Sequence, residues 1–159
     1  MRLLDIVDIL SRASNWCVGL LIVFLVSIMV IDVNVGVFCR YVLNDALSWT
    51  EELSRYCMVW MAYLGMSLAV RDKQHMGLDF IVEKFSPRAR SYIELGNRIV
   101  VMAFLVIVLR YSLSHLKVVR VQSSPSMEIS MFWPYLAVTV GMGLMILQNL
   151  RHMILIKFK

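Results

Sequence analysis

The sequence predicts an all-α integral membrane protein with four transmembrane helices. Hydrophobic residues make up 60% of the 159 residues, and the mean hydropathy is +0.73. Soluble domains contain only about 45–50% apolar residues. The apolar residues form four runs, and most Lys and Arg residues lie between these runs rather than within them. We therefore expect a single membrane domain that covers residues 1–159, with no separate soluble domain.

The four apolar runs cover approximately residues 16–39, 47–70, 95–116 and 131–150. Each run has about the 20 residues that a helix needs to cross roughly 30 Å of hydrocarbon. Helices are expected because lipid offers no hydrogen-bond partner to an unpaired backbone group. The fourth run is the clearest, since residues 129–150 carry no charge. The third is the weakest, because Arg98 and Arg110 flank only a short wholly apolar centre.

The distribution of Lys and Arg predicts the orientation of these helices. The two terminal flanks and the middle loop together carry ten of these residues, and the other face carries three. By the positive-inside rule, both termini and the middle loop should face the cytoplasm. The ten residues are Arg2, Arg12, Arg71, Lys73, Lys84, Arg88, Arg90, Arg151, Lys157 and Lys159, and the three are Arg40, Lys117 and Arg120.

The middle loop, residues 71–91, predicts a short interfacial arm helix. Hydrophobic residues between Leu78 and Phe85 alternate with charged ones, and Ser86-Pro87 ends the pattern. Such a segment can lie along the inner membrane surface with its apolar side chains in the lipid. A plain loop is the alternative. The residues expected to fix this arm are Arg71, His75 and Asp79.

Charged residues near the start of the second run should lie at the outer interface or be paired. Glu51 and Glu52 precede Arg55 by four and three residues, the spacings at which helix side chains meet. Arg110 in the third run is expected at the same membrane level. Unpaired charges are unfavourable at that depth. We therefore expect these four residues to form a polar cluster between helices or against a partner helix. The alternative is that they only mark the membrane boundary.

Asp32, in the outer part of the first run, has two interpretations. A carboxylate within a membrane helix is by default a candidate functional group, and it would suit a stand-alone proton-coupled small transporter. The structural interpretation is a contact within the bundle, in which Arg55 or Arg110 neutralises the charge. We favour the structural interpretation, because Asp32 lies only about two turns before Arg40, within reach of the outer interface.

No motif predicts catalysis, a cofactor, a metal or nucleic-acid binding. The chain has no Gly-x-Ser-x-Gly elbow, Gly-rich phosphate loop or His-Glu-x-x-His motif. A haem, as in a membrane cytochrome subunit, would need two histidines at one depth. The predicted topology separates His115 from His75 and His152. The net charge of +5 is explained by membrane topology rather than by nucleic acid. The chain is therefore not expected to be an enzyme.

An ordered set of motifs resembles one transporter family over nearly the whole chain. The family is the small, four-span membrane subunit of tripartite ATP-independent periplasmic (TRAP) transporters, the DctQ-like subunit. The residues that carry the resemblance are Arg40-Tyr41-Val42, Trp49-Thr50-Glu51-Glu52-Leu53, Arg55-Tyr56, Trp60, Gly65, Ala69, Arg71, His75, Asp79, the segment from Ser126 to Tyr135 and Gly141.

The resemblance implies two partners in a bacterial inner membrane system, besides the lipid bilayer. A large membrane subunit would carry the substrate and sodium sites and move as an elevator. A soluble periplasmic binding protein would deliver an organic acid such as sialic acid or a dicarboxylate. This chain would be a fixed scaffold whose outer half is tied together by Arg40, Trp49, Glu51, Glu52, Arg55 and Arg110. Candidate contacts with the binding protein are Asn44, Asp45, Ser126 and Glu128.

Overall fold

The computed structural model describes residues 2–71 and 87–157, and these residues form four long helices. The helices are α1 (Arg2–Tyr41), α2 (Ser48–Arg71), α4 (Pro87–Val119) and α5 (Phe132–Lys157). Three segments are long and apolar enough to cross a membrane, namely Ala13–Tyr41, Ser48–Val70 and Leu95–Val119. The prediction of an all-helical membrane protein is therefore confirmed.

Helix α5 is the exception among the four expected spans. It forms a helix over the expected region, but among the described residues it is not one of the three segments that are long and apolar enough to cross a membrane. Its polar residues, including Thr139, Gln148 and Asn149, lower its average hydropathy. These residues suit its position, because α5 contacts α1, α2 and α4. A helix that packs against three neighbours needs less apolar surface than one that faces lipid.

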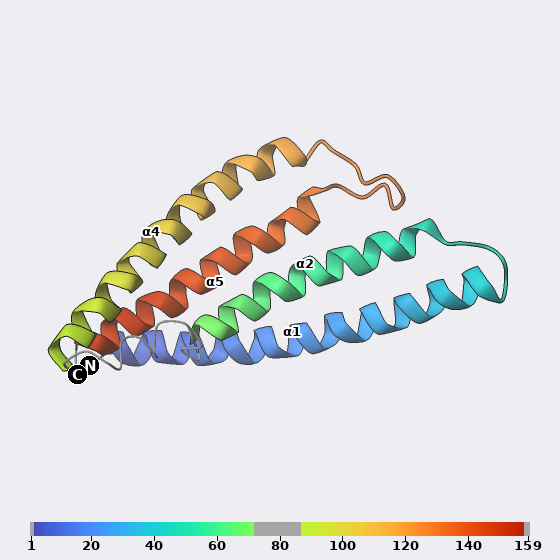
Figure 1. Ribbon diagram of the computed structural model, residues 1–159. Helices are drawn as coiled ribbons and strands as arrows, with labels where there is room; N and C mark the ends of the chain where they lie inside the picture. The colour runs from blue at the N-terminus through green and yellow to red at the C-terminus, as the bar shows by residue number, and fades with distance from the viewer. Residues whose placement is uncertain (1, 72–86, 158–159) are drawn as a thin grey trace.

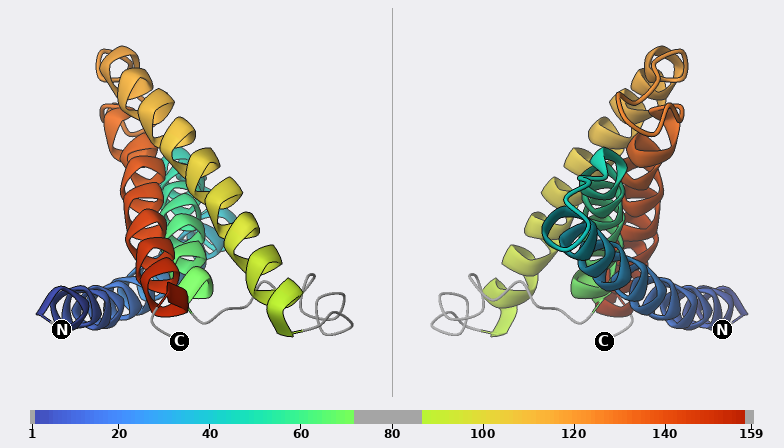
Figure 2. Two further views of the ribbon diagram at one scale, coloured as in Figure 1. Left: turned by 90° about the vertical axis from the view of Figure 1, so that its left-hand side faces the viewer. Right: turned by 90° about the vertical axis from the view of Figure 1, so that its right-hand side faces the viewer.

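The helices are arranged as a fan in the order α4, α5, α2, α1 (Figure 1). The end of α2 and the start of α4 lie at the same end of the bundle as the start of α1 and the end of α5. We call the opposite end the hairpin end, because it carries the α1–α2 loop (residues 42–47) and a hairpin between α4 and α5 (residues 120–131). Away from the hairpin end, the starts of α1 and α4 diverge to opposite sides (Figure 2).

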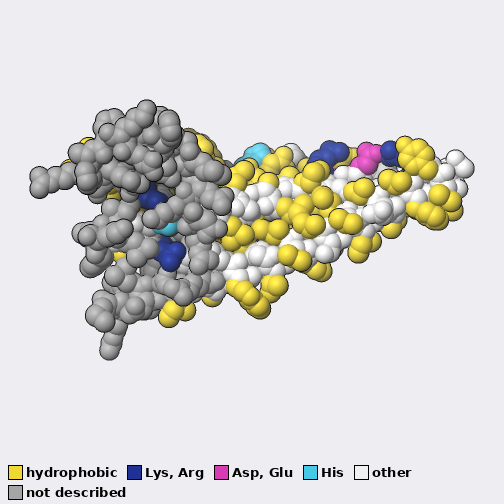
Figure 3. Space-filling view, turned by 60° about the horizontal axis from the view of Figure 1, so that its bottom comes forward, with side chains coloured by type: hydrophobic (Ala, Val, Ile, Leu, Met, Phe, Trp, Pro, Cys, Tyr) yellow, Lys and Arg dark blue, Asp and Glu magenta, His cyan; other side chains and the backbone are white. Residues whose placement is uncertain are grey.

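The core between the helices is small. Val70, Leu105, Met142 and Met145 form its buried centre, with partly buried residues such as Tyr63 packed against it. Much larger apolar surface remains exposed, including Phe24 and Ile31 on α1 and Phe104 on α4. Figure 3 shows hydrophobic side chains along one face of the bundle, with basic side chains toward both ends and an acidic side chain near one of them.

Helices α2 and α5 approach each other closely at Gly141. A Cβ atom at this position would lie 2.7 Å from Cβ and 3.0 Å from the carbonyl oxygen of Tyr63. These are atoms of a helix backbone and its first side-chain carbon, so they cannot move aside easily. Small residues of this kind let membrane helices pack closely. Gly143, two residues later, has nothing within 4 Å of the same position.

We predict that Gly141→Ala destabilises the bundle by about 1–3 kcal/mol, the usual range for overpacking a tight contact. Gly143→Ala is the matched control and should be neutral or slightly stabilising, because alanine favours helix and meets no neighbour there. Unfolding of the purified protein in detergent, by heat or by added dodecyl sulfate, measures the difference. Equal stability of the two variants would contradict the close approach.

Candidate functional site

The α1–α2 loop contains a left-handed residue, three positions after the last residue of α1. Asn44 has φ 54°, a conformation that asparagine tolerates better than most residues. The amide of Asp45 then donates to the carbonyl oxygen of Cys39 at 3.0 Å, which satisfies a carbonyl at the end of the helix. Asn44 and Asp45 are both exposed. The short turn brings the end of α1 next to the start of α2.

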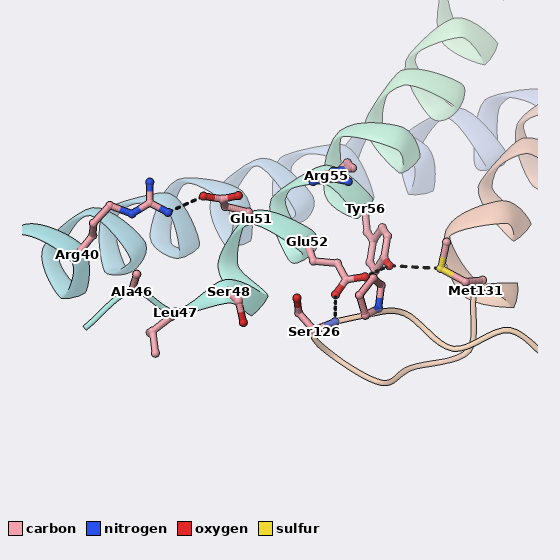
Figure 4. A pocket seen from close by; sticks show the side chains of 11 residues that line it. Arg40, Ala46, Leu47, Ser48, Glu51, Glu52, Arg55, Tyr56, Ser126 and Met131 are labelled. Atoms are coloured by element: carbon pink, nitrogen blue, oxygen red, sulfur yellow. Dashed lines mark hydrogen bonds and ion pairs between the residues drawn. The ribbon is translucent and has the colours of Figure 1, made fainter. Parts of the chain in front are cut away.

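This turn places Arg40 beside Glu51. Nη2 of Arg40 lies 2.5 Å from Oε1 of Glu51, and both side chains are about half exposed, 49% and 61% respectively. The pair links α1 to the first turn of α2 (Figure 4). A carboxylate in the first turn is also favoured by the helix dipole. Pairs this exposed usually contribute little stability, so this one orients the charges more than it holds the helices.

The α4–α5 hairpin has regular backbone pairing at its base. The amide of Ser124 donates to the carbonyl of Ile129 at 2.8 Å, and the amide of Met131 donates to that of Gln122 at 2.9 Å. Ser123 and Ser130 therefore face each other as an isolated antiparallel bridge. Residues 125–127 form the turn, and Glu128 has φ 53°. The tip of the hairpin is thus a tight, partly left-handed turn.

Glu52 connects this tip to α2. Its Oε2 accepts hydrogen bonds from the backbone amides of Ser126 and Met127, each at 3.0 Å. Its Oε1 accepts a hydrogen bond from the hydroxyl of Tyr56, one turn later on α2. Only 7% of Glu52 is exposed. Figure 4 shows the carboxylate between the hairpin and Tyr56, whose hydroxyl also lies 3.4 Å from Sδ of Met131.

Two open cavities flank these residues, and both are lined by Arg40, Glu51 and Arg55. The first, of about 500 Å³, lies toward the hairpin and is also lined by Ala46, Leu47, Ser48, Glu52, Tyr56, Pro125, Ser126 and Met131. The second, of about 440 Å³, lies along the α1–α2 groove and is also lined by Val33, Gly36, Val37, Tyr41, Thr50, Ser54 and Met58.

The structure brings some of the expected polar residues together and separates others. Arg40, Glu51, Glu52 and Arg55 surround the first cavity. Arg110 lines neither cavity and is exposed on α4, and Trp49 is exposed at the start of α2. Among the residues that the structure describes, neither Arg55 nor Arg110 forms a salt bridge. The expected helix-spaced pairs of Glu51 and Glu52 with Arg55 are replaced by contacts with α1 and with the hairpin.

Asp32 is buried between α1 and α2, with 4% of its surface exposed. The hydroxyl of Ser54 donates to its Oδ2 at 2.6 Å. Its Oδ1 is buried and has no hydrogen-bond partner in the described part of the chain. Asp32 is therefore not neutralised by Arg55 or Arg110 in this structure. Its observed contact is with another helix of the bundle.

Sequence reasoning missed a second group of polar contacts, which lies away from the hairpin end. Gln148 of α5 accepts a hydrogen bond from Ser11 at 2.6 Å and donates one to Asn15 at 2.8 Å. The side-chain amide of the adjacent Asn149 donates to the carbonyl oxygen of Arg98 on α4 at 3.1 Å. The signal was present, because Ser11 and Asn15 are four residues apart and Gln148-Asn149 interrupts an apolar run.

The expected arm is only partly covered by the structure. Arg71 is the last residue of α2, and its side chain is outside the described part. His75 and Asp79 also lie outside the described residues. Within residues 2–71 and 87–157, no three His, Cys, Asp or Glu side chains are placed so that they could hold a metal ion.

Long apolar helices, joined by hydrogen bonds between buried polar side chains, define a multi-pass helical membrane protein. Comparison with protein families then identifies which one. Residues 28–156 match the model of the family described as tripartite ATP-independent periplasmic transporters, DctQ component. The match covers most of the chain, so this protein belongs to that family and is a small permease subunit of TRAP type.

Individual relatives agree with this assignment. A putative TRAP transporter small permease protein of Haemophilus influenzae is 33% identical over 85 residues, 54% of this chain and 53% of the relative. The isethionate TRAP transporter permease protein DctMQ of Oleidesulfovibrio alaskensis is 25% identical over 136 residues, 84% of this chain and 21% of that protein. The sialic acid TRAP transporter small permease protein SiaQ of Vibrio cholerae is 25% identical over 111 residues, 70% of this chain and 64% of the relative. The chain thus matches only about half of the first relative and a fifth of the second.

We predict that Gln148→Ala destabilises the bundle by about 1 kcal/mol, because it removes one side of a buried hydrogen-bonded set. Asn34→Ala is the matched amide control. Asn34 is exposed, and its side chain bonds only to the Val30 carbonyl of its own helix in the described structure. Detergent unfolding of both variants tests this. Equal stability would show that the Ser11–Gln148–Asn15 contacts do not tie α5 to α1.

Proposed function

We propose that this chain is the fixed scaffold of a sodium-driven transporter for an organic acid, in which it braces the large permease subunit. In this proposal all four helices cross the inner membrane, and both termini lie in the cytoplasm. The hairpin end is then the periplasmic face and helps dock the binding protein. Sialic acid or a dicarboxylate is the class of cargo, and the large subunit carries the substrate and sodium sites.

One observation supports the scaffold role most directly: few residues of the apolar helices are buried against the other helices of this chain. Within the most apolar windows of Ala13–Tyr41, Ser48–Val70 and Leu95–Val119, only 11%, 22% and 11% of the residues are buried. The remaining apolar surface must face lipid or another membrane protein. Many buried polar side chains of this chain form hydrogen bonds between its own helices. Such bonds suit a subunit that keeps its shape while its partner moves.

The DctMQ relative supports the presence of a large membrane partner. This chain matches only 21% of that permease protein, so most of the relative is additional chain. A domain that is fused to a larger permease in one protein is expected to bind such a permease when it is separate. We therefore place the large subunit against the exposed apolar faces of the bundle.

Arg55 is the polar residue best placed to contact that partner. It lies seven residues after Ser48, which corresponds to about 10 Å along the helix, within the apolar segment Ser48–Val70. It is exposed, lines both cavities and forms no ion pair in the described structure. An arginine at that depth is stabilised by a carboxylate or another polar group of a partner.

We predict that Arg55→Ala reduces the amount of large subunit that co-purifies with this chain by about tenfold, which corresponds to 1.4 kcal/mol. Lys117→Ala is the control, since Lys117 is an exposed cation in the last turn of α4 that lines neither cavity. Among assembled complexes, the preference between competing organic acids should be unchanged. An altered substrate preference in Arg55→Ala would contradict the scaffold role.

A further inference from the structure

We propose that Glu52 is a positioning residue that holds the tip of the α4–α5 hairpin in the conformation required to dock the binding protein. This inference rests on the proposed docking function and adds a specific device to it. Glu52 itself is buried, so its role is to fix the residues that the partner contacts rather than to touch the partner.

The contacts of Glu52 differ from those of its neighbour Glu51. Glu51 is 61% exposed and pairs with Arg40. Glu52 is 7% exposed, and all of its described partners are hydrogen-bond donors. Two of these donors are consecutive backbone amides that belong to a segment 74 and 75 residues away. The carboxylate therefore selects a backbone conformation of the hairpin tip and joins it to α2.

The tip has few other means of fixing its shape. Pro125 has no amide hydrogen to donate, and the backbone pairing around Ser123 and Ser130 ends before the turn. Glu128 occupies a left-handed conformation that non-glycine residues adopt rarely. The two backbone hydrogen bonds to Oε2 of Glu52 stabilise the tip in spite of the missing Pro125 amide and the left-handed Glu128. With Ser126 and Met127 fixed, the exposed side chains of Ser126 and Glu128 present a constant polar surface at the hairpin end.

A carboxylate is the side chain that suits this position. It is an acceptor at both oxygens, so one oxygen can serve the two amides while the other serves Tyr56. The isosteric Glu52→Gln keeps the volume but turns one oxygen into an NH₂ donor. If that donor faces the two backbone amides, both of their hydrogen bonds are lost. If it faces the tyrosine hydroxyl, which can also accept, the two amides keep only a neutral acceptor in place of a charged one, and their hydrogen bonds weaken. Glu52→Gln therefore tests the carboxylate with little change in packing.

The experiment uses the assembled transporter, with the large subunit and the binding protein present. In Glu52→Gln we expect docking of the binding protein to weaken about tenfold, a change of 1.4 kcal/mol. Hydrogen exchange in residues 122–131 should rise in the same variant. Glu51→Gln removes the neighbouring carboxylate charge without touching the hairpin, so it should leave both quantities unchanged.

A disulfide provides a rescue that a general structural defect would not show. Ser123 and Ser130 lie opposite each other, and the backbone hydrogen bonds join the residues on either side of them rather than these two serines. In such a non-hydrogen-bonded pair the Cα atoms are about 4.5 Å apart. This distance is within the range that a disulfide can bridge. Adding Ser123→Cys and Ser130→Cys to Glu52→Gln should restore docking in the oxidised protein and lose it again on reduction. Ser123→Cys and Ser130→Cys in a protein that keeps Glu52 show whether the two cysteines alone change docking. Docking that is restored only in the oxidised form would support the inference, because the disulfide stiffens the hairpin without replacing its contact with α2.

A surface variant separates this inference from the docking function itself. If Glu128→Lys weakens docking but Glu52→Gln does not, the positioning role is wrong and docking through the hairpin stands. If neither variant affects docking, the docking function is wrong. If the Glu52→Gln variant does not assemble with the large subunit, hydrogen exchange in the unaltered complex tests the positioning role instead. The hydrogens of the Ser126 and Met127 amides should then exchange at least about ten times more slowly than those of an unstructured peptide. Exchange of these two amides at the unstructured rate would overturn the proposal.

Discussion

The hydrogen bonds that Glu52 accepts from Tyr56, Ser126 and Met127 are the contact on which the hairpin end depends. A carboxylate can be buried there only because donors surround it. Those donors come from α2 itself and from a hairpin more than 70 residues later in the chain. One side chain thus fixes the position of the α4–α5 hairpin relative to α2, whereas the exposed pair of Arg40 and Glu51 lies across the neighbouring α1–α2 turn and contributes little stability.

Polar contacts at the two ends of the bundle complement each other. Away from the hairpin end, Gln148 joins α5 to α1 and Asn149 joins it to α4. Between the two ends, Gly141 lets α5 approach α2 closely. Apolar surface between helices is small, and in lipid the hydrophobic effect gives helices little reason to associate. Close packing and buried hydrogen bonds therefore hold the fan together and leave its apolar faces for lipid and a partner.

The parts of the fold that depend on long local patterns could be predicted, whereas contacts between distant segments could not. Runs of apolar residues predicted the helices, and the turn chemistry of Asn44 agrees with its left-handed conformation. Helix spacing predicted contacts of Glu51 and Glu52 with Arg55. The structure instead pairs Glu51 with Arg40 across a turn and Glu52 with backbone amides. A backbone donor can belong to almost any residue type, so the sequence does not reveal it. Arg110 is separate because α4 packs mainly on α5 rather than on α1 or α2, and no local pattern encodes that arrangement.

The central claim is that the buried polar groups of this chain join its own segments and bind neither cargo nor coupling ions. A high-resolution structure of the complete transporter with its organic acid and sodium bound tests this most directly. We expect both ligands to lie on the large subunit, with Glu52 still at the amides of Ser126 and Met127 and Asp32 still at Ser54. Coordination of the acid or of sodium by Asp32 or Glu52 would contradict the claim.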